Sequence, residues 1–181
     1  MEYYKTISLK DGRECVLRNG TENDGQATLD VFVLTHRQTD YLLSYPDEIE
    51  LTAEQQSEFL RNKTASDHEI SILAEVDGQV VGLAGIEAVG KYAKTRRRAS
   101  FGVSIDEAFW GLGVGRALTR ACVESAKKAG YAQLELEVVA DNHKAIALYE
   151  SEGFVTFGQN PRGFFSRTSG WQELLLMRLE L

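Results

Sequence analysis

The sequence predicts one α+β domain built around a mixed sheet. Two observations lead to this class. An antiparallel run of strand patterns occupies the middle of the chain, and strand and helix patterns alternate after it. The 181 residues contain only two prolines and no low-complexity tract or linker, so nothing divides the chain into separate units. We therefore expect a single domain over residues 1–181.

The first third of the chain is expected to form a hairpin and two helices. Residues 5–10 and 13–18 alternate between apolar and polar side chains around the Asp-Gly pair at 11–12, which is a hairpin signal. A helical apolar stripe then covers about 24–44 and stops at a Tyr-Pro-Asp break. A second helix covers about 52–61 and opens on a Thr-x-x-Gln capping box.

The rest of the chain predicts the antiparallel run and then the alternating elements. The signals are a second Asp-Gly turn, a glycine loop before a helix, and glycines that stop two helices. The expected elements are strands over 70–76, 79–87 and 98–105, a helix from the glycine loop to Gly130, a strand over 134–139, a helix over 142–151, strands over 154–158 and 173–181, and a polar loop over 159–170.

Composition and charge exclude several classes of protein. The formal net charge of −7 argues against nucleic-acid binding, although Arg96, Arg97 and Arg98 form one short basic cluster. No apolar run reaches about 18 residues and the first residues lack a signal-peptide core, so we expect a cytoplasmic protein without a membrane partner. Cys15 and Cys122 form no CxxC pair and are expected to be buried free thiols.

The most informative motif is the glycine loop over 109–116, Phe-Trp-Gly-Leu-Gly-Val-Gly-Arg. Its alternate glycines leave little side chain, so successive backbone N–H groups can point at one anion at the positive end of the next helix. The loop matches neither the P-loop G-x-x-x-x-G-K-[ST] nor the dinucleotide fingerprint G-x-G-x-x-G. We therefore expect a site for phosphate or pyrophosphate of another kind.

A second motif follows the glycine loop after about thirty residues: Asn142-x-x-Ala145-x-x-Leu148-Tyr149-x-x-x-Gly153-Phe154. The two motifs together resemble the GNAT superfamily of N-acetyltransferases. Residues 110–115 are similar to its Gln/Arg-x-x-Gly-x-Gly/Ala pyrophosphate loop, and the second motif is similar to the family's other acetyl-CoA motif. The resemblance covers about 71–181 well, and the first two helices only in their order. It implies a three-layer fold whose mostly antiparallel sheet splays between the two strands that flank acetyl-CoA.

The resemblance also divides the domain by role. Residues 1–66 would form the N-terminal strands and acceptor-side helices, 70–158 the acetyl-CoA-binding core, and 159–181 an acceptor-side loop and the C-terminal strand. Acetyl-CoA is the implied co-substrate, and no metal is expected. The implied cofactor-binding residues are Val103, Ser104, Ile105, Trp110, Gly111, Leu112, Gly113, Val114, Gly115, Arg116, Asn142, Ala145 and Tyr149. Trp110 stands where the family has Gln or Arg. If that side chain normally contacts the pyrophosphate, the contact is either missing here or supplied by Arg116. The Trp110 indole itself either packs against the sheet or covers the cofactor.

The catalytic residues follow from the same resemblance, which implies direct attack by an amine in a ternary complex. Tyr149 falls on the family's tyrosine, placed to protonate the departing CoA sulfur; the alternative is an aromatic packing residue. Glu87, at the end of a central strand, is the candidate general base. Glu135 and Glu137 are further candidates, and ordered water is the alternative to all three. Asn142 is expected to cap its helix and to contact the pantetheine.

The acceptor is the part that the sequence determines least. An aromatic and acidic mouth would favour a cationic amine: a polyamine, a lysine side chain, a peptide N-terminus or an aminoglycoside. Ordinary surface acids are an equal alternative. The mouth residues are Tyr41, Tyr45, Asp47, Glu48, Phe164 and Phe165. A catalytically idle acetyl-CoA sensor and an interaction module with a relic loop stay open, and a homodimer through 173–181 follows only from family analogy.

Overall fold

The computed structural model describes residues 1–181 and forms one eight-stranded sheet with four α-helices. The strand order is β1-β2-β3-β4-β5-β6-β8-β7, and only β5 and β6 are parallel neighbours. The strands are β1 Tyr4–Ser8, β2 Glu14–Asn19, β3 Ile70–Val76, β4 Gln79–Ala88, β5 Arg98–Ile105, β6 Gln133–Val139, β7 Val155–Ser166 and β8 Gly170–Glu180. The helices are α1 Gly25–Gln38, α2 Ala53–Ala65, α3 Val114–Lys128 and α4 His143–Ser151.

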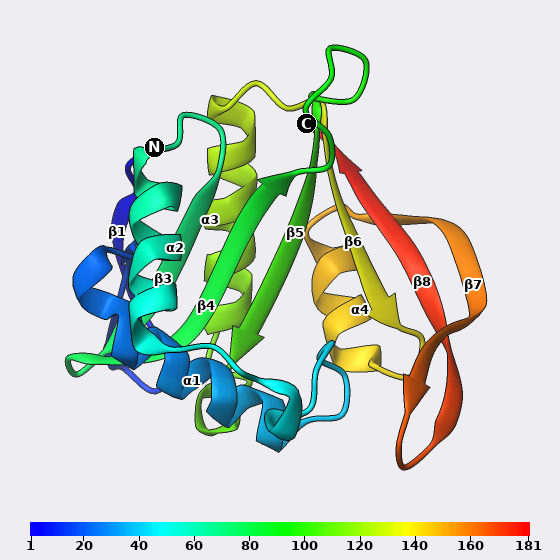
Figure 1. The fold of residues 1–181 in the computed structure, drawn as a ribbon, viewed down its shortest axis with the longest axis horizontal. Helices are drawn as coiled ribbons and strands as arrows, with labels where there is room; N and C mark the ends of the chain where they lie inside the picture. Colours follow the sequence, from blue (N-terminus) through cyan, green and yellow to red (C-terminus); the bar gives the residue numbers. More distant parts are fainter.

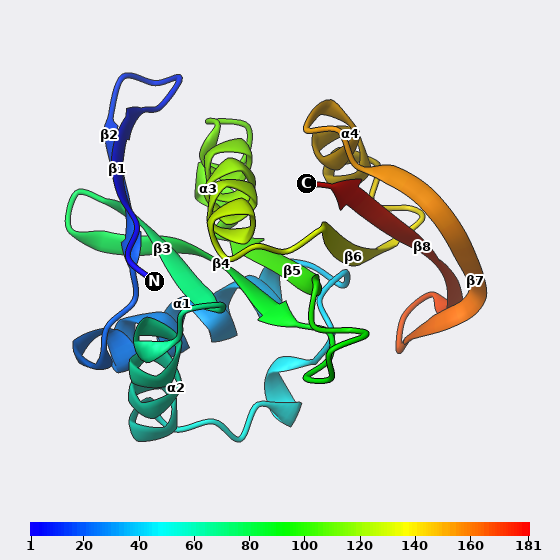
Figure 2. The ribbon, with the colours of Figure 1, turned by 90° about the horizontal axis from the view of Figure 1, so that it is seen from above.

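Helices cover both faces of the sheet. Seen along the sheet in Figure 2, α3 and α4 lie on one side and α1 and α2 on the other. The main core lies on the α3 side, where Leu118, Cys122 and Ala126 recur every fourth residue and pack with Ile72 and Leu134 of the sheet. The predicted three-layer α+β fold is confirmed.

The sheet opens between its two parallel strands. β5 and β6 pair only through Arg98–Ser100 and Gln133–Glu135. Beyond these residues the strands diverge toward their C-terminal ends, while β5 stays paired with β4 and β6 with β8 (Figure 1). The facing edges of β5 and β6 therefore carry backbone groups without a partner strand. The predicted splay is present, and the space between the diverging strands is called the opening below.

The turns and caps fall where the sequence places them. Gly12 and Gly78 have φ values of 89° and 76°, which the tight hairpins at the two Asp-Gly pairs require. The Thr52 hydroxyl accepts a hydrogen bond from the Gln55 N–H, and the Gln55 side chain accepts one from the Thr52 N–H. The predicted capping box is therefore confirmed.

The first helix is shorter than predicted. α1 ends at Gln38 rather than near 44, because Thr39 has extended backbone with φ −150° and ψ 149°. Next to it, the Asp40 carboxylate accepts hydrogen bonds from the hydroxyls of Ser166 and Thr168. These hydrogen bonds to the β7–β8 hairpin outweigh the helix-forming tendency of the apolar stripe, and so the helix ends earlier than the sequence predicted.

The predicted polar loop over 159–170 is wrong, because these residues continue a long hairpin. β7 runs to Ser166 and β8 begins at Gly170, so only a short turn separates them. A register shift after Asn160 forms a bulge that takes up Pro161. β7 is an edge strand, where proline removes no ladder hydrogen bond, so a sequence that reads as a loop still forms a strand.

Three further features concern the whole chain. Cys15 and Cys122 are buried free thiols, as predicted, and burial raises the pKa of Cys122. None of the helices combines the length and apolar composition needed to cross a bilayer. The structure gathers no group of three or more His, Cys, Asp or Glu side chains that could hold a metal ion.

Candidate active site

The glycine loop joins β5 to α3 and leaves a row of backbone donors free. Gly111 and Gly113 have φ values of 77° and 106°, which favour glycine, and Gly113 is the N-cap residue of α3. The N–H groups of Gly113, Val114, Gly115 and Arg116 donate no backbone hydrogen bond within the protein. These free donors lie at the positive end of α3, which is where an anion binds best.

Space for an anion lies at the same loop. A Cβ built on Gly111 or Gly113 would meet no atom within 4 Å, so both glycines border open space. Gly115 differs, because its Cβ would lie 3.1 Å from Ile105 Cδ1 and 3.2 Å from Leu148 Cδ2. Two glycines therefore shape a cradle, and the third lets α3 pack against β5 and α4. The pyrophosphate of acetyl-CoA fits this arrangement of open space and free amides.

Trp110 closes the turn between β5 and the loop. Its Nε1 donates a 2.8 Å hydrogen bond to the carbonyl oxygen of Ile105, the last residue of β5. The ring is 44% exposed, and Lys144 Nζ of α4 lies 5.7 Å from the ring centre. Arg116, the other residue considered for the phosphate, pairs with Glu152 at 3.1 Å. The indole therefore has a structural role whether or not it contacts the cofactor.

The opening leads from the glycine loop to the middle of the sheet. Val103, Ser104 and Ile105 lie on β5 beyond its last residue paired with β6, so their strand edge faces no partner. A Cβ built on the preceding Gly102 would meet no atom within 4 Å. An extended chain that carries amide groups, such as pantetheine, can bind such an edge as an added strand would.

Tyr149 of α4 lies close to the point where the strands separate. Its ring packs edge-on against Phe101 with 6.1 Å between ring centres, and Phe101 directly follows the last β5 residue paired with β6. The side chain is only 8% exposed. Burial raises the pKa of Tyr149 to about 12, and no hydrogen bond or neighbouring charge opposes this shift. The phenol is therefore protonated at neutral pH.

Asn142 holds the start of the same helix. Its Oδ1 accepts a 3.3 Å hydrogen bond from the N–H of Ala145, which confirms the predicted N-cap. The Tyr41 hydroxyl lies 3.5 Å from the carbonyl oxygen of the neighbouring Asp141. Asn142, Ala145 and Tyr149 therefore share one short helix beside the opening.

Three glutamates of the central strands differ in their partners. Glu87 of β4 pairs with Lys63 of α2 at 2.8 Å. Glu135 pairs with Arg98, and this guanidinium lowers the pKa of Glu135. Glu137 lies two residues further along β6, past its last residue paired with β5, and its side chain is exposed. Of the three, Glu137 alone forms no ion pair.

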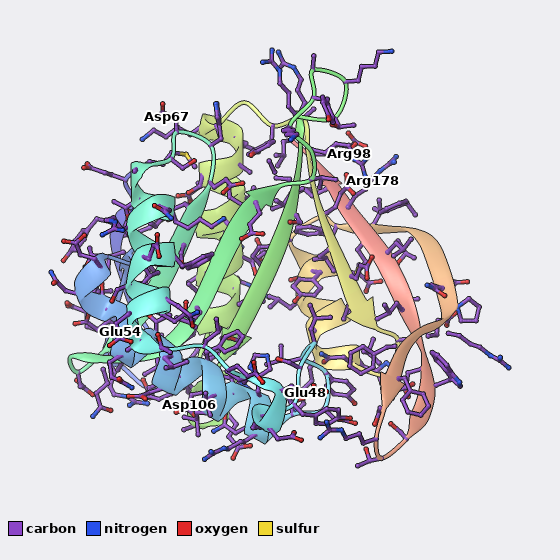
Figure 3. All side chains as sticks on the ribbon, viewed as in Figure 1. Glu48, Glu54, Asp67, Arg98, Asp106 and Arg178 are labelled. Atoms are coloured by element: carbon purple, nitrogen blue, oxygen red, sulfur yellow. The ribbon has the colours of Figure 1, made fainter.

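Residues 39–52 between α1 and α2, called the strap, contain about six residues that the sequence wrongly placed in the first helix, followed by the break and the helix start that it predicted. Glu48, labelled in Figure 3, lies between α1 and the β7–β8 hairpin. Arg167 of the β7–β8 turn donates to both carboxylate oxygens of Asp47, at 2.8 and 2.9 Å, and to Glu48 at 3.1 Å. Its guanidinium carbon lies 4.0 Å from the centre of the Tyr45 ring. The aromatic and acidic residues therefore hold an arginine of the same chain.

Two more contacts change the expected mouth. Phe165 packs on Trp171 with 5.0 Å between ring centres and is 59% exposed. The next residue of the strand, Ser166, contacts the strap, so Phe165 lies on the opposite face of β7. At the other end, Gln38 donates to the Asp106 carboxylate at 2.8 Å and accepts from the Glu107 N–H at 3.0 Å. Gln38, at the end of α1, thus ties that helix to the turn before the glycine loop. No local signal points to this contact, because the partners lie 68 and 69 residues away in the sequence.

Comparison with known proteins gives the class to which this fold and site belong. Residues 33–154 match the model of the acetyltransferase (GNAT) family, and the chain belongs to that family. A curated relative, the ribosomal protein bS18-alanine N-acetyltransferase of Escherichia coli (strain K12), is 37% identical over 81 residues. These residues are 45% of this chain and 54% of that protein, so the chain spans about half the length of this relative.

Solved structures share the fold over nearly the whole chain. The acetyltransferase of the GNAT family from Streptococcus pneumoniae has a TM-score of 0.88 at 26% identity, covering 92% of this chain and 99% of that one. The putative acetyltransferase yncA from Salmonella typhimurium, solved with its cofactor acetyl-CoA, has a TM-score of 0.80 at 20% identity. It covers 92% of this chain and 94% of that one, and at this identity the likeness concerns the fold alone.

Proposed function

We propose that the protein is an N-acetyltransferase that moves an acetyl group from acetyl-CoA to a primary amine. The observation that carries the proposal is the glycine loop, with free amides over 113–116 beside open space at Gly111 and Gly113. The unpaired edge of β5 continues from this loop toward Tyr149, as a pantetheine arm requires. Membership of the GNAT family supports the same chemistry.

Tyr149 is the residue that we assign to the leaving group. Acetyl-CoA, when bound, supplies a thioester whose sulfur must be protonated as the amine attacks. A phenol with a pKa raised to about 12 stays protonated at every pH at which an enzyme of this kind would work, so it can donate that proton. The free backbone N–H groups near Val103 and Ser104 are the donors that would polarise the thioester carbonyl.

For the proton of the amine we propose Glu137, acting directly or through water. Glu87, the first candidate from the sequence, is held by Lys63 of α2 at 2.8 Å. Glu137 has no ion-pair partner and lies on the part of β6 that has left β5. A carboxylate must be free and near the reacting groups to accept a proton, which favours Glu137.

A pair of matched variants tests this choice. We expect Glu137→Gln to lower kcat by about 100-fold with KM for acetyl-CoA nearly unchanged, because a general base contributes to turnover and not to cofactor binding. Glu87→Gln is expected to change kcat by less than about threefold and to lower stability slightly, since Lys63 loses one of its two partners. The opposite pattern in steady-state kinetics would return the role to Glu87.

For the acceptor we propose the N-terminal α-amine of a peptide. The matched E. coli relative is named for acetylating an alanine of a ribosomal protein, although the match covers about half of it. In this chain Arg167 already pairs with Asp47 and Glu48 and offsets one of their two negative charges, which weakens the attraction for a polyamine or an aminoglycoside. A small, singly charged amine suits the remaining site better.

An assay of CoA release over an amine panel tests both levels of the proposal. The panel holds alanine-starting peptides, the same peptides with an acetylated N-terminus and an internal lysine, a polyamine and an aminoglycoside. We expect release above background hydrolysis with the free N-termini alone. Release with the polyamine alone would change the acceptor and keep the enzyme class. Acetyl-CoA binding without release for any amine would favour a sensor.

A further inference from the structure

A second concave site lies at the other end of α3 from the glycine loop. A pocket of about 560 Å³ is formed by the α2–β3 loop, the β4–β5 loop and the α3–β6 connection, with His68, Lys91 and Arg96 among its lining residues. The 15 residues of α3 separate it from the glycine loop by roughly 22 Å. In Figure 1 the β4–β5 loop projects beyond the sheet at this end. The pocket is therefore distinct from the proposed active site.

The pocket concentrates positive charge in an acidic protein. Its end of the molecule carries Lys91, Lys94, Arg96, Arg97, Lys127 and Lys128. Lys91 and Arg96 form no ion pair, and Arg97 makes only a long 3.4 Å hydrogen bond to the carbonyl oxygen of Gly130. The chain as a whole has a formal net charge of −7, and yet none of its carboxylates forms an ion pair with Lys91 or Arg96.

Two of the acids near the pocket, Glu69 and Glu87, already have a partner in Lys63. Lys63 lies 2.7 Å from Glu69 and 2.8 Å from Glu87. Glu69 also accepts a 3.1 Å hydrogen bond from the N–H of Ala88. Two lysines in the last turn of α3 offset the partial negative charge at that helix end. Glu69 and Glu87 are therefore engaged by Lys63 and do not pair with Lys91 or Arg96.

Tyr131 is the buried aromatic residue of the pocket lining, and it is only 6% exposed. Its hydroxyl oxygen is covered by protein and has no hydrogen-bond partner, and burial together with the nearby Glu69 carboxylate raises its pKa. A ligand in the pocket would therefore meet the exposed cations of the β4–β5 loop and not this hydroxyl.

We propose that this pocket binds a small anion that carries a phosphate or carboxylate group. Lys91, Arg96 and Arg97, which line the pocket, supply the positive charge. Charge-assisted hydrogen bonds of this kind are stronger than neutral ones, and a concave site suits a small molecule. A nucleic acid would need a broader basic surface than this pocket and its loop provide.

Amide NMR on the full-length protein tests the proposal and separates the two anion sites. The titrants are inorganic phosphate and malonate at constant ionic strength, which keeps general screening equal. We expect saturable shifts of the Gly90 and Gly130 signals, which report the pocket, while Gly111 and Gly113 report the glycine loop separately. The titrant that saturates at lower concentration identifies the preferred group, phosphate or carboxylate.

Three variants complete the test. Lys91→Gln combined with Arg96→Gln is expected to weaken pocket binding about tenfold, and Arg97→Gln severalfold. Arg61→Gln on the outer side of α2 removes an exposed charge elsewhere and should leave binding unchanged. Shifts at Gly111 and Gly113 alone, shifts that do not saturate, or equal binding by the double variant would overturn the proposal. Binding of a single-stranded RNA far tighter than either small anion would do so too.

Discussion

At the scale of single residues, Tyr149 has a buried side chain whose phenol is protonated at neutral pH. Its ring is fixed by contacts with Phe101 and Phe154, at 6.1 and 5.9 Å between ring centres. The ring packs as an aromatic packing residue would, and the hydroxyl forms no hydrogen bond within the protein. Packing alone would be satisfied by phenylalanine, so the hydroxyl is the part that needs a functional explanation.

Tyr149→Phe separates the two roles. We expect kcat to fall about 100-fold and KM for acetyl-CoA to change less than about threefold, because the lost group acts on the leaving sulfur. Stability should stay within about 0.5 kcal/mol of the parent, since no hydrogen bond is lost. Tyr4→Phe, at a side chain 73% exposed on the far edge strand, is the control. Unchanged kcat in Tyr149→Phe would reduce the residue to packing.

At the scale of elements, the glycine loop and the N-terminus of α3 act as one unit. The positive φ of Gly113 turns the chain into the helix, and the next three residues leave their N–H groups free. The loop geometry is local, so a glycine pattern alone was enough to predict it. The orientation of the loop relative to β5 depends also on Trp110, whose indole holds the Ile105 carbonyl.

Gly113→Ala should impair the loop in two ways. The φ of 106° costs an alanine about 1–2 kcal/mol, and the new Cβ would enter the open space of the cradle. We expect acetyl-CoA affinity to fall at least about tenfold by calorimetry. Gly78→Ala, at φ 76° in the β3–β4 turn and also facing open space, introduces similar strain far from the loop. Equal loss of affinity in both variants would mean that global strain, not the cradle, is responsible.

The strap is the second element with a testable role. It is tied to the β7–β8 turn by Arg167 and, through the hydroxyls of Ser166 and Thr168, by Asp40. At its start, Gln38 of α1 is bound to Asp106 beyond the end of β5. The strap therefore links the β5 half of the sheet to the β8 half across the opening. The strands themselves join these halves through only one short paired stretch.

Arg167→Gln should release the strap without unfolding the protein. We expect amide hydrogen exchange over 39–52 to become at least about tenfold faster, because the guanidinium contacts to Tyr45, Asp47 and Glu48 are lost. Exchange in α2 should not change. Arg37→Gln, an exposed arginine at the end of α1, is the matched control. Unchanged exchange over 39–52 would mean that Asp40 and the Tyr45 hydroxyl, which accepts a hydrogen bond from the backbone N–H of residue 167, are enough to hold the strap.

At the scale of the whole molecule, the fold is one continuous sheet whose two halves are weakly joined. β8 lies inside the sheet between β6 and β7, so its edges are both paired. A dimer formed by strand pairing would therefore need an edge strand, β1 or β7, and not the C-terminal strand that family analogy suggested. A homodimer of either kind stays a prediction.

Global stability should depend on the Arg18–Asp24 ion pair at low pH. Arg18 of β2 binds Asp24 at 2.8 Å and Glu75 of β3 at 2.9 Å, and its guanidinium lowers the pKa of Asp24 to about 2. The folded pKa lies below the unfolded value of about 3.9, so the pair stabilises the protein above pH 4. This contribution is lost as the pH falls from about 4 to 2.

Asp24→Asn tests this pair by urea unfolding at several pH values. We expect the unfolding free energy at pH 7 to fall by about 1 kcal/mol, a value reduced for partial solvent screening. The difference from the parent should shrink toward pH 2, where the parent's Asp24 is itself protonated. Asp67→Asn, at an exposed residue without an ion pair, should change little at any pH. A difference that is constant with pH would exclude the ion pair as its cause.

The sequence by itself determined the fold class, most element positions and the glycine loop. These features depend on local rules: glycines allow positive φ, Thr52 and Asn142 cap helices, and apolar periodicity marks buried faces. Such rules act over a few residues, and so they can be applied to the sequence alone. The same reasoning failed for 159–170, because a bulged edge strand and a loop have the same composition.

Only the tertiary structure decided which charged groups are free. Glu87, Glu135 and Glu137 look alike in the sequence, yet Lys63 and Arg98 engage the first two and leave the third. Arg167 likewise meets the acidic strap across about 120 residues of sequence. Pairing between distant side chains depends on strand order and on how the elements pack. The sequence therefore predicts where acetyl-CoA would bind, and the packing of the strands decides which of the three carboxylates is left without an ion pair.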